Sequence, residues 1–531
     1  MFATVRGDPP ITEPDRYLKT YTVTLALESL HAPVERIVLN LPDHEPEIVT
    51  RLHWEPRQGY IQILDPDDPT GFNTITIPDP SARPEDFHWR WYGRSANFTV
   101  GLTVEAGVVA GRVTGRVQRY AIEPRGNGRI TLGVSNGDFW QTHEGDRERE
   151  RAQRLAPVVA SDTVAGLASS AKSKVTSAPL SPLATNRDAS TLPRPEGSAW
   201  DTKCAGPVPE GFHVIDVLQL YTEGLSDRYD DDLSALRPVL RETLDDANQA
   251  LRNSGVSTIV FSPRGPELLP NESVPVFNYD TQSILLALLR AMGAMRFDDF
   301  PYFTFNENAY VPSRRNAMWA DVVAVARNGE LAGGTPSCGA AYVNNVVANS
   351  GYPTEPGGVD AWRFGYLVYD PGCNADRLNL AHELGHLLGM DHDPANPTYS
   401  GTYLSCPWSW GHRRGFGDPR FTFRTVMSYP DPGNGAVGIP NCDHTDNCPQ
   451  IDAYSTPLLE WAGSPGSGGS PPFGLQPAGT VSGALPIGVP PPPAPWLRPA
   501  NGVDTISRVA PTVAAYRPRP DDIFAHGFDF P

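Results

Sequence analysis

The chain has 531 residues, of which 40% are hydrophobic, so it is long enough to bury at least two cores. Its 43 basic and 61 acidic residues give a net charge of −18, which argues against nucleic acid or an anionic membrane surface as a partner. No apolar stretch reaches the roughly 18 residues of a membrane-spanning helix, and the longest, Ile284 to Met295, contains Arg290. We therefore expect a soluble protein with no membrane insertion.

Residues 1–150 contain short segments in which apolar and polar residues alternate, such as 21–27 and 98–104, separated by Gly, Pro and Asp clusters. This pattern predicts a mainly antiparallel β domain. Residues 151–205 are rich in Ser, Ala, Thr and Pro and have little periodicity. They are predicted to form a flexible linker with protease-accessible sites.

Residues 206–462 alternate between strand and helix patterns, which favours an α/β domain. Residues 463–500 are rich in Gly and Pro and are predicted to form a loop. Residues 501–531 are predicted to supply a closing helix and a tail. The predicted strands are 214–220, 256–261, 322–326 and 364–369, and the predicted helices are 233–251, one that starts near Asp280, and 503–516.

The six cysteines lie at Cys204 or beyond, and an even number confined to one region indicates disulfides in an oxidising compartment. Reduced, buried thiols are the alternative. Residues 1–15 lack the apolar core of a secretory signal, so we expect that a signal was removed or that the start is misplaced.

The segment from Leu380 to Asp393 has the composition of a metal site. On a helix, His382 and His386 project from the same face, one turn apart, as two nitrogens bound to one zinc ion must. Glu383 can reach a zinc-bound water and take its proton. Gly389 can end the helix in a left-handed conformation, so that His392 turns back as the third ligand. The alternative is a buried helix whose histidines are hydrogen-bonded core residues.

The run from His382 to Asp393 resembles the extended zinc signature of the metzincin metallopeptidases, and an Asp directly after the third His is typical of their reprolysin (adamalysin) branch. Thr425 to Tyr429 resembles the metzincin Met-turn, with Met427 beneath the zinc. Tyr429 is similar to the astacin and serralysin residue that stabilises the oxyanion. The resemblance implies a catalytic domain with a mixed twisted sheet and a zinc-binding active-site helix.

Residues 91–133 are similar to the pro-domain of bacterial reprolysin-like precursors. The resemblance implies a secreted zinc endopeptidase with one catalytic Zn²⁺, ligands His382, His386 and His392, and catalytic residues Glu383 and Tyr429. Its substrates would be proteins or peptides, and its own N-terminal domain would be a candidate inhibitor. Cys204 has two interpretations: a thiolate switch on the zinc, or one half of a structural disulfide.

Two other interpretations keep the same motifs. In one, the chain is a catalytically silent adhesion or binding protein whose β domain recognises a surface ligand. In the other, it is an enzyme whose residues 1–150 target it to a substrate. No motif indicates Ca²⁺, because the cluster around Asp230 lacks EF-hand spacing and is explained by a helix start. His412 and His444 lie in polar loops and are expected to be solvated.

Overall fold

A computed structural model describes about half of the chain. The described residues are 2–6, 17–25, 34–42, 44–58, 60–64, 74–83, 86–115, 118–125, 129–135, 207–270, 310–328, 338–341, 365–373, 378–393, 405–406, 408–414, 423–428, 450–456 and 500–517. The predicted linker, the helix near Asp280, Cys204, Tyr429, His444 and the predicted loop 463–500, except its last residue, lie outside these residues. None of the described helices has the length and apolar character needed to cross a membrane.

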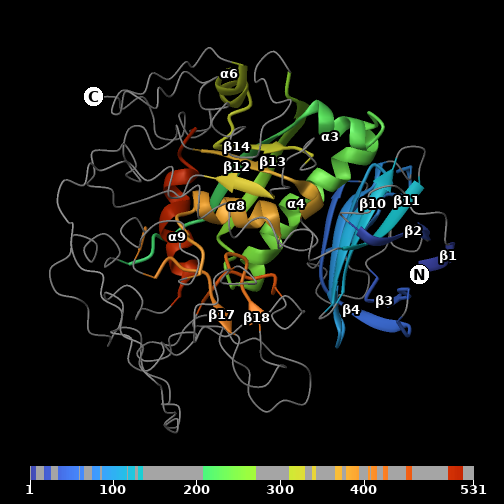
Figure 1. The fold of residues 1–531 in the computed structure, drawn as a ribbon. Helices are drawn as coiled ribbons and strands as arrows, with labels where there is room; N and C mark the ends of the chain where they lie inside the picture. Colours follow the sequence, from blue (N-terminus) through green and yellow to red (C-terminus); the bar gives the residue numbers. More distant parts are fainter. Residues whose placement is uncertain are drawn as a thin grey trace, which may run out of the picture.

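The N-terminal region forms a nine-stranded antiparallel sheet in the order β1-β2-β11-β10-β9-β8-β7-β4-β3 (Figure 1). Residues 21–25 of the first alternating segment fall in β2, and the segment 98–104 falls in β8. A hairpin of β5 (Tyr60–Leu64) and β6 (Thr74–Pro78) is paired separately. The strands are β1 (Phe2–Arg6), β2 (Tyr17–Leu25), β3 (Arg36–Leu39), β4 (Glu47–Gln58), β7 (His88–Arg94), β8 (Phe98–Glu105), β9 (Val108–Gly115), β10 (Arg119–Arg125) and β11 (Arg129–Ser135).

Both faces of this sheet are buried in its central strands, but the two faces differ in chemistry. Because side chains alternate along a strand, Trp89 and Trp91 point into an apolar core together with Val100 and Leu102. The residues between them, including Arg90, belong to the opposite face, which is polar yet buried. A buried polar face must have partners, and helix α4 provides them.

A second sheet has five strands in the order β13-β12-β14-β16-β15. Four strands are parallel and β15 is antiparallel, so the sheet is mixed. Every residue of β14 is buried, as expected for a parallel strand covered on both faces. The strands are β12 (His213–Tyr221), β13 (Ile259–Leu268), β14 (Val322–Ala326), β15 (Gly339–Ala341) and β16 (Tyr366–Tyr369).

Helix α4 (Leu233–Asn253) contacts both sheets and also the helix α8 (Asn379–Leu387), so it lies at the centre of the molecule (Figure 1). It begins after Asp232, whose carboxylate accepts a hydrogen bond from the Ser234 amide, as the helix-start interpretation of that Asp cluster predicts. Leu236, Leu240 and Leu244 point into the core beneath the five-stranded sheet. Helix α9 (Gly502–Val513) contacts β12.

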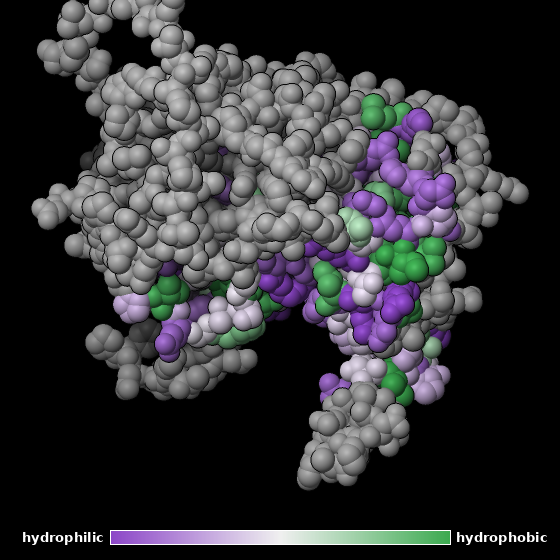
Figure 2. Space-filling view, turned by 90° about the horizontal axis from the view of Figure 1, so that it is seen from below, coloured by the Kyte–Doolittle hydropathy of each residue, from purple (hydrophilic) through white to green (hydrophobic). Residues whose placement is uncertain are grey.

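Smaller elements complete the described structure. They are the helices α3 (Glu223–Arg228) and α6 (Tyr310–Ala317), the 3-10 turn η6 (Pro371–Cys373), and a ladder of β17 (Arg413–Arg414) with β18 (Phe423–Arg424). Seen from below, the described surface shows small hydrophobic patches between hydrophilic residues (Figure 2). The assignment of this architecture to the metzincin class, and the division of the chain into domains, stay predictions.

Candidate metal centre

Helix α8 carries the first two histidines and ends where the sequence predicts. Gly389 has a φ of +86°, the left-handed conformation that glycine adopts without strain. Its amide donates to the His386 carbonyl at 2.9 Å, and the Met390 amide donates to the Gly385 carbonyl at 3.0 Å. These two hydrogen bonds form a Schellman motif, which stops the helix and turns the chain back toward His392.

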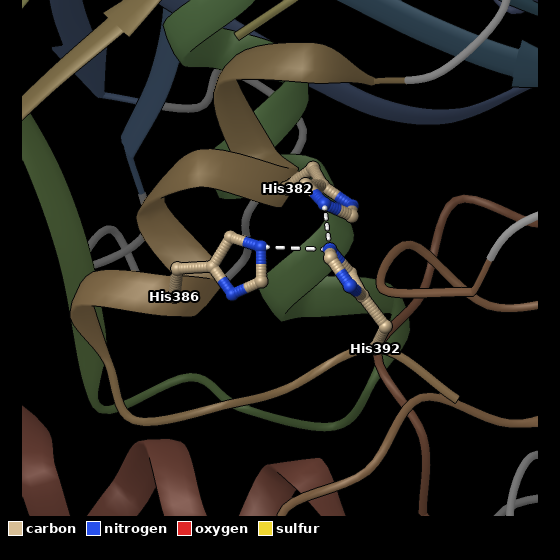
Figure 3. Close-up of side chains that lie close together, drawn as sticks. All are labelled: His382, His386 and His392. Carbon is tan, nitrogen blue, oxygen red and sulfur yellow. Dashed lines mark hydrogen bonds between the residues drawn. The ribbon is translucent and has the colours of Figure 1, made fainter. Parts of the chain in front are cut away.

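The three histidines converge on one point. The Nε2 atom of His392 lies 3.1 Å from that of His382 and 3.0 Å from that of His386 (Figure 3). All three side chains are buried, and their ligand atoms lie within 4.8 Å of one another. Nitrogens bound tetrahedrally to one zinc ion at about 2.05 Å would be roughly 3.3 Å apart, so the spacing suits one metal ion.

Two backbone carbonyls determine which nitrogen carries the proton in the rings of His382 and His386. His382 Nδ1 lies 2.9 Å from the Val426 carbonyl, and His386 Nδ1 lies 2.9 Å from the Met390 carbonyl. A carbonyl only accepts, so each Nδ1 carries the proton and each Nε2 presents a lone pair to the common point. Burial lowers the pKa of His386 to about 4, which keeps this ring neutral at physiological pH. Neutral imidazole is the form that binds a metal.

Glu383 is buried next to His382 and faces the antiparallel edge strand β15. A Cβ atom added to Gly339 in β15 would collide with the Glu383 carboxylate. The absence of a side chain at Gly339 therefore lets the edge strand approach this carboxylate closely. The structure places the predicted general base beside both the histidine cluster and a strand edge.

The turn 425–428 lies under the site helix. The Ser428 amide donates to the Thr425 carbonyl at 3.0 Å, which closes the turn. Buried Met427 lies against Gly385, where an added Cβ would meet its sulfur. Met427 thus packs against the helix that carries the first two histidines. Tyr429, the residue after the turn, lies outside the described residues.

The expectation that His412 is solvated is wrong. Its side chain is 5% exposed and packs against Phe423 with ring centroids 5.6 Å apart. The polar composition around His412 suggests a surface loop, but its backbone amide donates to Thr425 Oγ1 at 2.8 Å and so docks the segment against the turn that supports the site. Within the described part of the chain, His412 is not a member of the histidine cluster.

A disulfide joins Cys338 to Cys373, with Cα atoms 5.7 Å apart. The Cys338 carbonyl also accepts a hydrogen bond of 2.5 Å from Asn379 Nδ2 at the start of α8. Both links hold the beginning of β15 next to the site helix. Cys406 is also disulfide-bonded, to a cysteine outside the described residues. Sequence spacing did not identify the Cys338–Cys373 pair, because six cysteines allow fifteen pairings.

Comparison with models of protein families finds no match, and comparison with curated protein sequences finds none. Among solved structures, the chain is similar to one titled as a chaperone-substrate complex, with a TM-score of 0.35, 17% identity, and coverage of 59% of this chain and 36% of that one. It thus spans about a third of that chain's length. It is also similar to metalloproteinase-II from Bacteroides fragilis, with a TM-score of 0.27, 12% identity, and coverage of 71% of this chain and 88% of that one. At these TM-scores, neither similarity defines the fold or function of this chain.

Proposed function

We propose that the protein is a zinc-dependent endopeptidase of the metzincin type, made as a secreted, latent precursor. One observation carries the proposal: three buried imidazoles converge on one point, and Glu383, next to His382 on the same helix, has its carboxylate against the antiparallel strand β15. A structural zinc site would be closed by a fourth protein ligand. Within the described residues this cluster has three, which suits a catalytic site with one position for water.

Imidazole ligands suit zinc, copper, iron and nickel, and three of them with a neighbouring carboxylate base suit hydrolysis by zinc. When bound by His382, His386 and His392, zinc would lower the pKa of a bound water to about 7 and polarise the substrate carbonyl. Glu383 would take a proton from that water and pass it to the leaving amine. Tyr429 is proposed as an oxyanion donor on the strength of the metzincin resemblance.

Strand β15 favours an extended peptide as the substrate. It is the last strand of the five-stranded sheet, and among the described residues it pairs through one side with β16. A peptide that adds to the other side would lie close to Glu383, because this carboxylate packs directly against Gly339 of the strand. A peptide that runs past the site in this way would be cut internally.

Secretion is proposed from the disulfides at Cys338 and Cys406, which suit an oxidising compartment. Latency is proposed from the resemblance of residues 91–133 to a pro-domain. Both interpretations of Cys204, a thiolate on the zinc or a disulfide partner, stay open, because this residue lies outside the described residues.

The test is cleavage of a quenched-fluorescent peptide library by the full chain, before and after a cut in the linker, and by its Glu383→Ala variant. Zinc content is measured on every sample. The proposal predicts equal zinc in both proteins and cleavage by the unmodified protein alone. If both proteins hold zinc and neither cuts, the catalytically silent binding protein becomes the better interpretation.

A further inference from the structure

Helix α4 has an acidic face that the metal centre does not use. Glu242, Asp245 and Asp246 lie on this face at helical spacing, and each is at most 4% exposed. Three carboxylates three and four residues apart repel one another when they are ionised. This face therefore requires cationic partners, and the nine-stranded sheet supplies them.

Arginines of the sheet pair with the two aspartates of this face. Arg90 Nη2 donates to Asp246 Oδ1 at 2.9 Å, and Arg112 Nε donates to Asp246 Oδ2 at 2.5 Å. Arg57 Nη1 donates to Asp245 Oδ2 at 2.8 Å. Arg90 is 0% exposed and Arg112 is 3% exposed, so water does not screen these pairs. One aspartate thus pairs with two buried guanidinium groups.

Arg112 also connects the sheet to the segment 450–456, which contacts the site helix α8. Its Nη2 atom donates to Asp452 Oδ2 at 2.6 Å, and its Nη1 atom donates to Asp452 Oδ1 at 3.2 Å. Tyr454, two residues further along, donates its hydroxyl to the Ala381 carbonyl of α8 at 2.7 Å. The interface and the site helix therefore share one short segment.

A second group of contacts has the opposite polarity. Here the sheet supplies the carboxylate of Glu123, which accepts hydrogen bonds of 3.0 and 3.2 Å from Arg228 of α3. Arg125 of the sheet donates to the Arg228 carbonyl at 3.3 Å. Charges of both signs on each partner define a single register, because sliding one surface along the other would bring like charges together.

The interface is also closely packed. Ala110 of β9 belongs to the same buried apolar cluster as Val239 and Leu240 of α4. A Cβ atom added to Gly101 of β8 would lie 3.1 Å from Glu242 Oε1 and 3.5 Å from Asp246 Oδ1. The sheet backbone thus approaches the acidic face so closely that a methyl group here would require Glu242 to move by a few tenths of an ångström.

We propose that the nine-stranded sheet is a permanent structural partner of α4, which stays bound after the chain is cut between residues 135 and 207. The mature protein is then a non-covalent pair of two pieces of this chain. The pairing does not depend on peptidase activity. A pro-domain that leaves after cleavage would need to separate the buried arginines from Asp246 and Asp452 and expose the apolar contact around Ala110.

The first test uses the full chain with a specific protease site inserted after residue 150. The protein is cut to completion and passed over a size-exclusion column at pH 7.5 in 0.15 M salt, with and without zinc. The proposal predicts that both pieces elute together, in equal amounts, at the position of the uncut chain. Separate elution of the N-terminal piece from the unmodified protein would overturn it.

Two isosteric variants on the same helix face then test the charge pairing. Asp246→Asn removes one counter-charge that two buried arginines share, and we expect the cut pieces to dissociate about 100-fold more readily. Glu242→Gln is the matched control, because Glu242 accepts from Thr103 and its charge acts on Arg90 and Arg112 without the direct hydrogen bonds that Asp246 makes. Its pieces should stay together. Circular dichroism of the uncut variants checks that they fold.

Equal behaviour of the two variants would contradict the pairing. If uncut Asp246→Asn does not fold, the same comparison is made with Glu123→Gln, which removes the carboxylate that Arg228 and Arg125 share. We expect the pieces of this variant to separate about tenfold more readily than those of Glu242→Gln. Equal dissociation of the pieces of Glu123→Gln and Glu242→Gln would again contradict the charge pairing. Retention of zinc in a separated C-terminal piece would show that the metal centre survives without the sheet.

Discussion

Two buried polar regions, the histidine cluster on and after α8 and the acidic face of α4, differ in the groups that they bring together. At the metal centre, three buried imidazoles point to one place. At the acidic face of α4, guanidinium groups of the sheet occupy the position of the counter-ion. The metal centre suits a cation from solution, whereas the acidic face of α4 is already paired with cationic side chains of the chain itself. A ligand site and a structural interface are thus distinguished by whether side chains of the protein supply the counter-charges of the buried polar groups.

The largest effect is expected at the metal centre. Glu383→Gln keeps the size of the side chain but cannot take a proton, so kcat should fall by about 10² to 10⁴ with unchanged zinc content. The measurement is steady-state hydrolysis of a selected peptide, with metal analysis of the same sample. Glu242→Gln, the same substitution at the other region, is the control and should keep its kcat. A Glu383→Gln protein with normal kcat would remove this carboxylate from the mechanism.

The next effect is on stability. Asp246→Asn leaves Arg90 and Arg112 without a full counter-charge in a buried environment, so the free energy of unfolding of the uncut chain should fall by about 3 to 5 kcal/mol. Urea unfolding followed by circular dichroism measures this loss. Asp504→Asn in α9, whose carboxylate pairs with the partly buried Arg508 on its own helix, is a control that should lose about 1 kcal/mol or less. Similar losses would mean that the buried pairs contribute no more than a partly exposed one.

Gly339→Ala tests the close approach of β15 to Glu383. The new methyl group must displace either the strand or the carboxylate, which costs about 1 to 3 kcal/mol in packing. We expect a fall of kcat/KM of about tenfold or more, with zinc content unchanged, because the atoms nearest the new methyl group belong to Glu383 and not to a histidine. Gly224→Ala in α3, where an added Cβ meets nothing within 4 Å, is the control. Normal kcat/KM in Gly339→Ala would argue against substrate binding along this edge.

The smallest effect is a pH dependence of the interface. Burial, together with the neighbouring charge of Asp246, raises the pKa of Glu242 to about 7. A carboxyl whose pKa is raised on folding binds a proton that the unfolded chain releases near pH 4.5, so its contribution to stability is complete below that pH and is lost as the pH rises through 7. The unmodified protein should therefore lose about 1 to 2 kcal/mol more between pH 5 and pH 8 than Glu242→Gln. Parallel stability curves for the two proteins would contradict this.

Much of the metal centre could be predicted from sequence because its geometry is local. His382, His386 and His392 lie within eleven residues, and helical spacing plus the left-handed Gly389 almost define their arrangement. The same holds for the start of α4, where Asp232 caps the helix, and for β14, whose bounds match the predicted strand 322–326.

Contacts between distant segments could not be predicted in this way. The Val426 carbonyl that orients His382, the Cys338–Cys373 disulfide and the burial of His412 each depend on chain folding over long sequence separations. The acidic residues of α4 have the helical spacing of an ordinary solvated face, and Arg90 looks like an exposed residue of an alternating strand. One signal was available: Gly101, in the middle of a strand, indicates close approach of another backbone or side chain.

Metal analysis of the purified full chain tests the central claim most directly. After dialysis against trace zinc, the unmodified protein should hold one zinc ion per chain, and X-ray absorption should show histidine nitrogens at about 2.0 to 2.1 Å. His386→Ala should hold none, while Arg508→Ala, a change remote from the cluster, should hold one. Equal zinc in the unmodified and His386→Ala proteins, or no zinc in either, would contradict a metal centre at these three histidines.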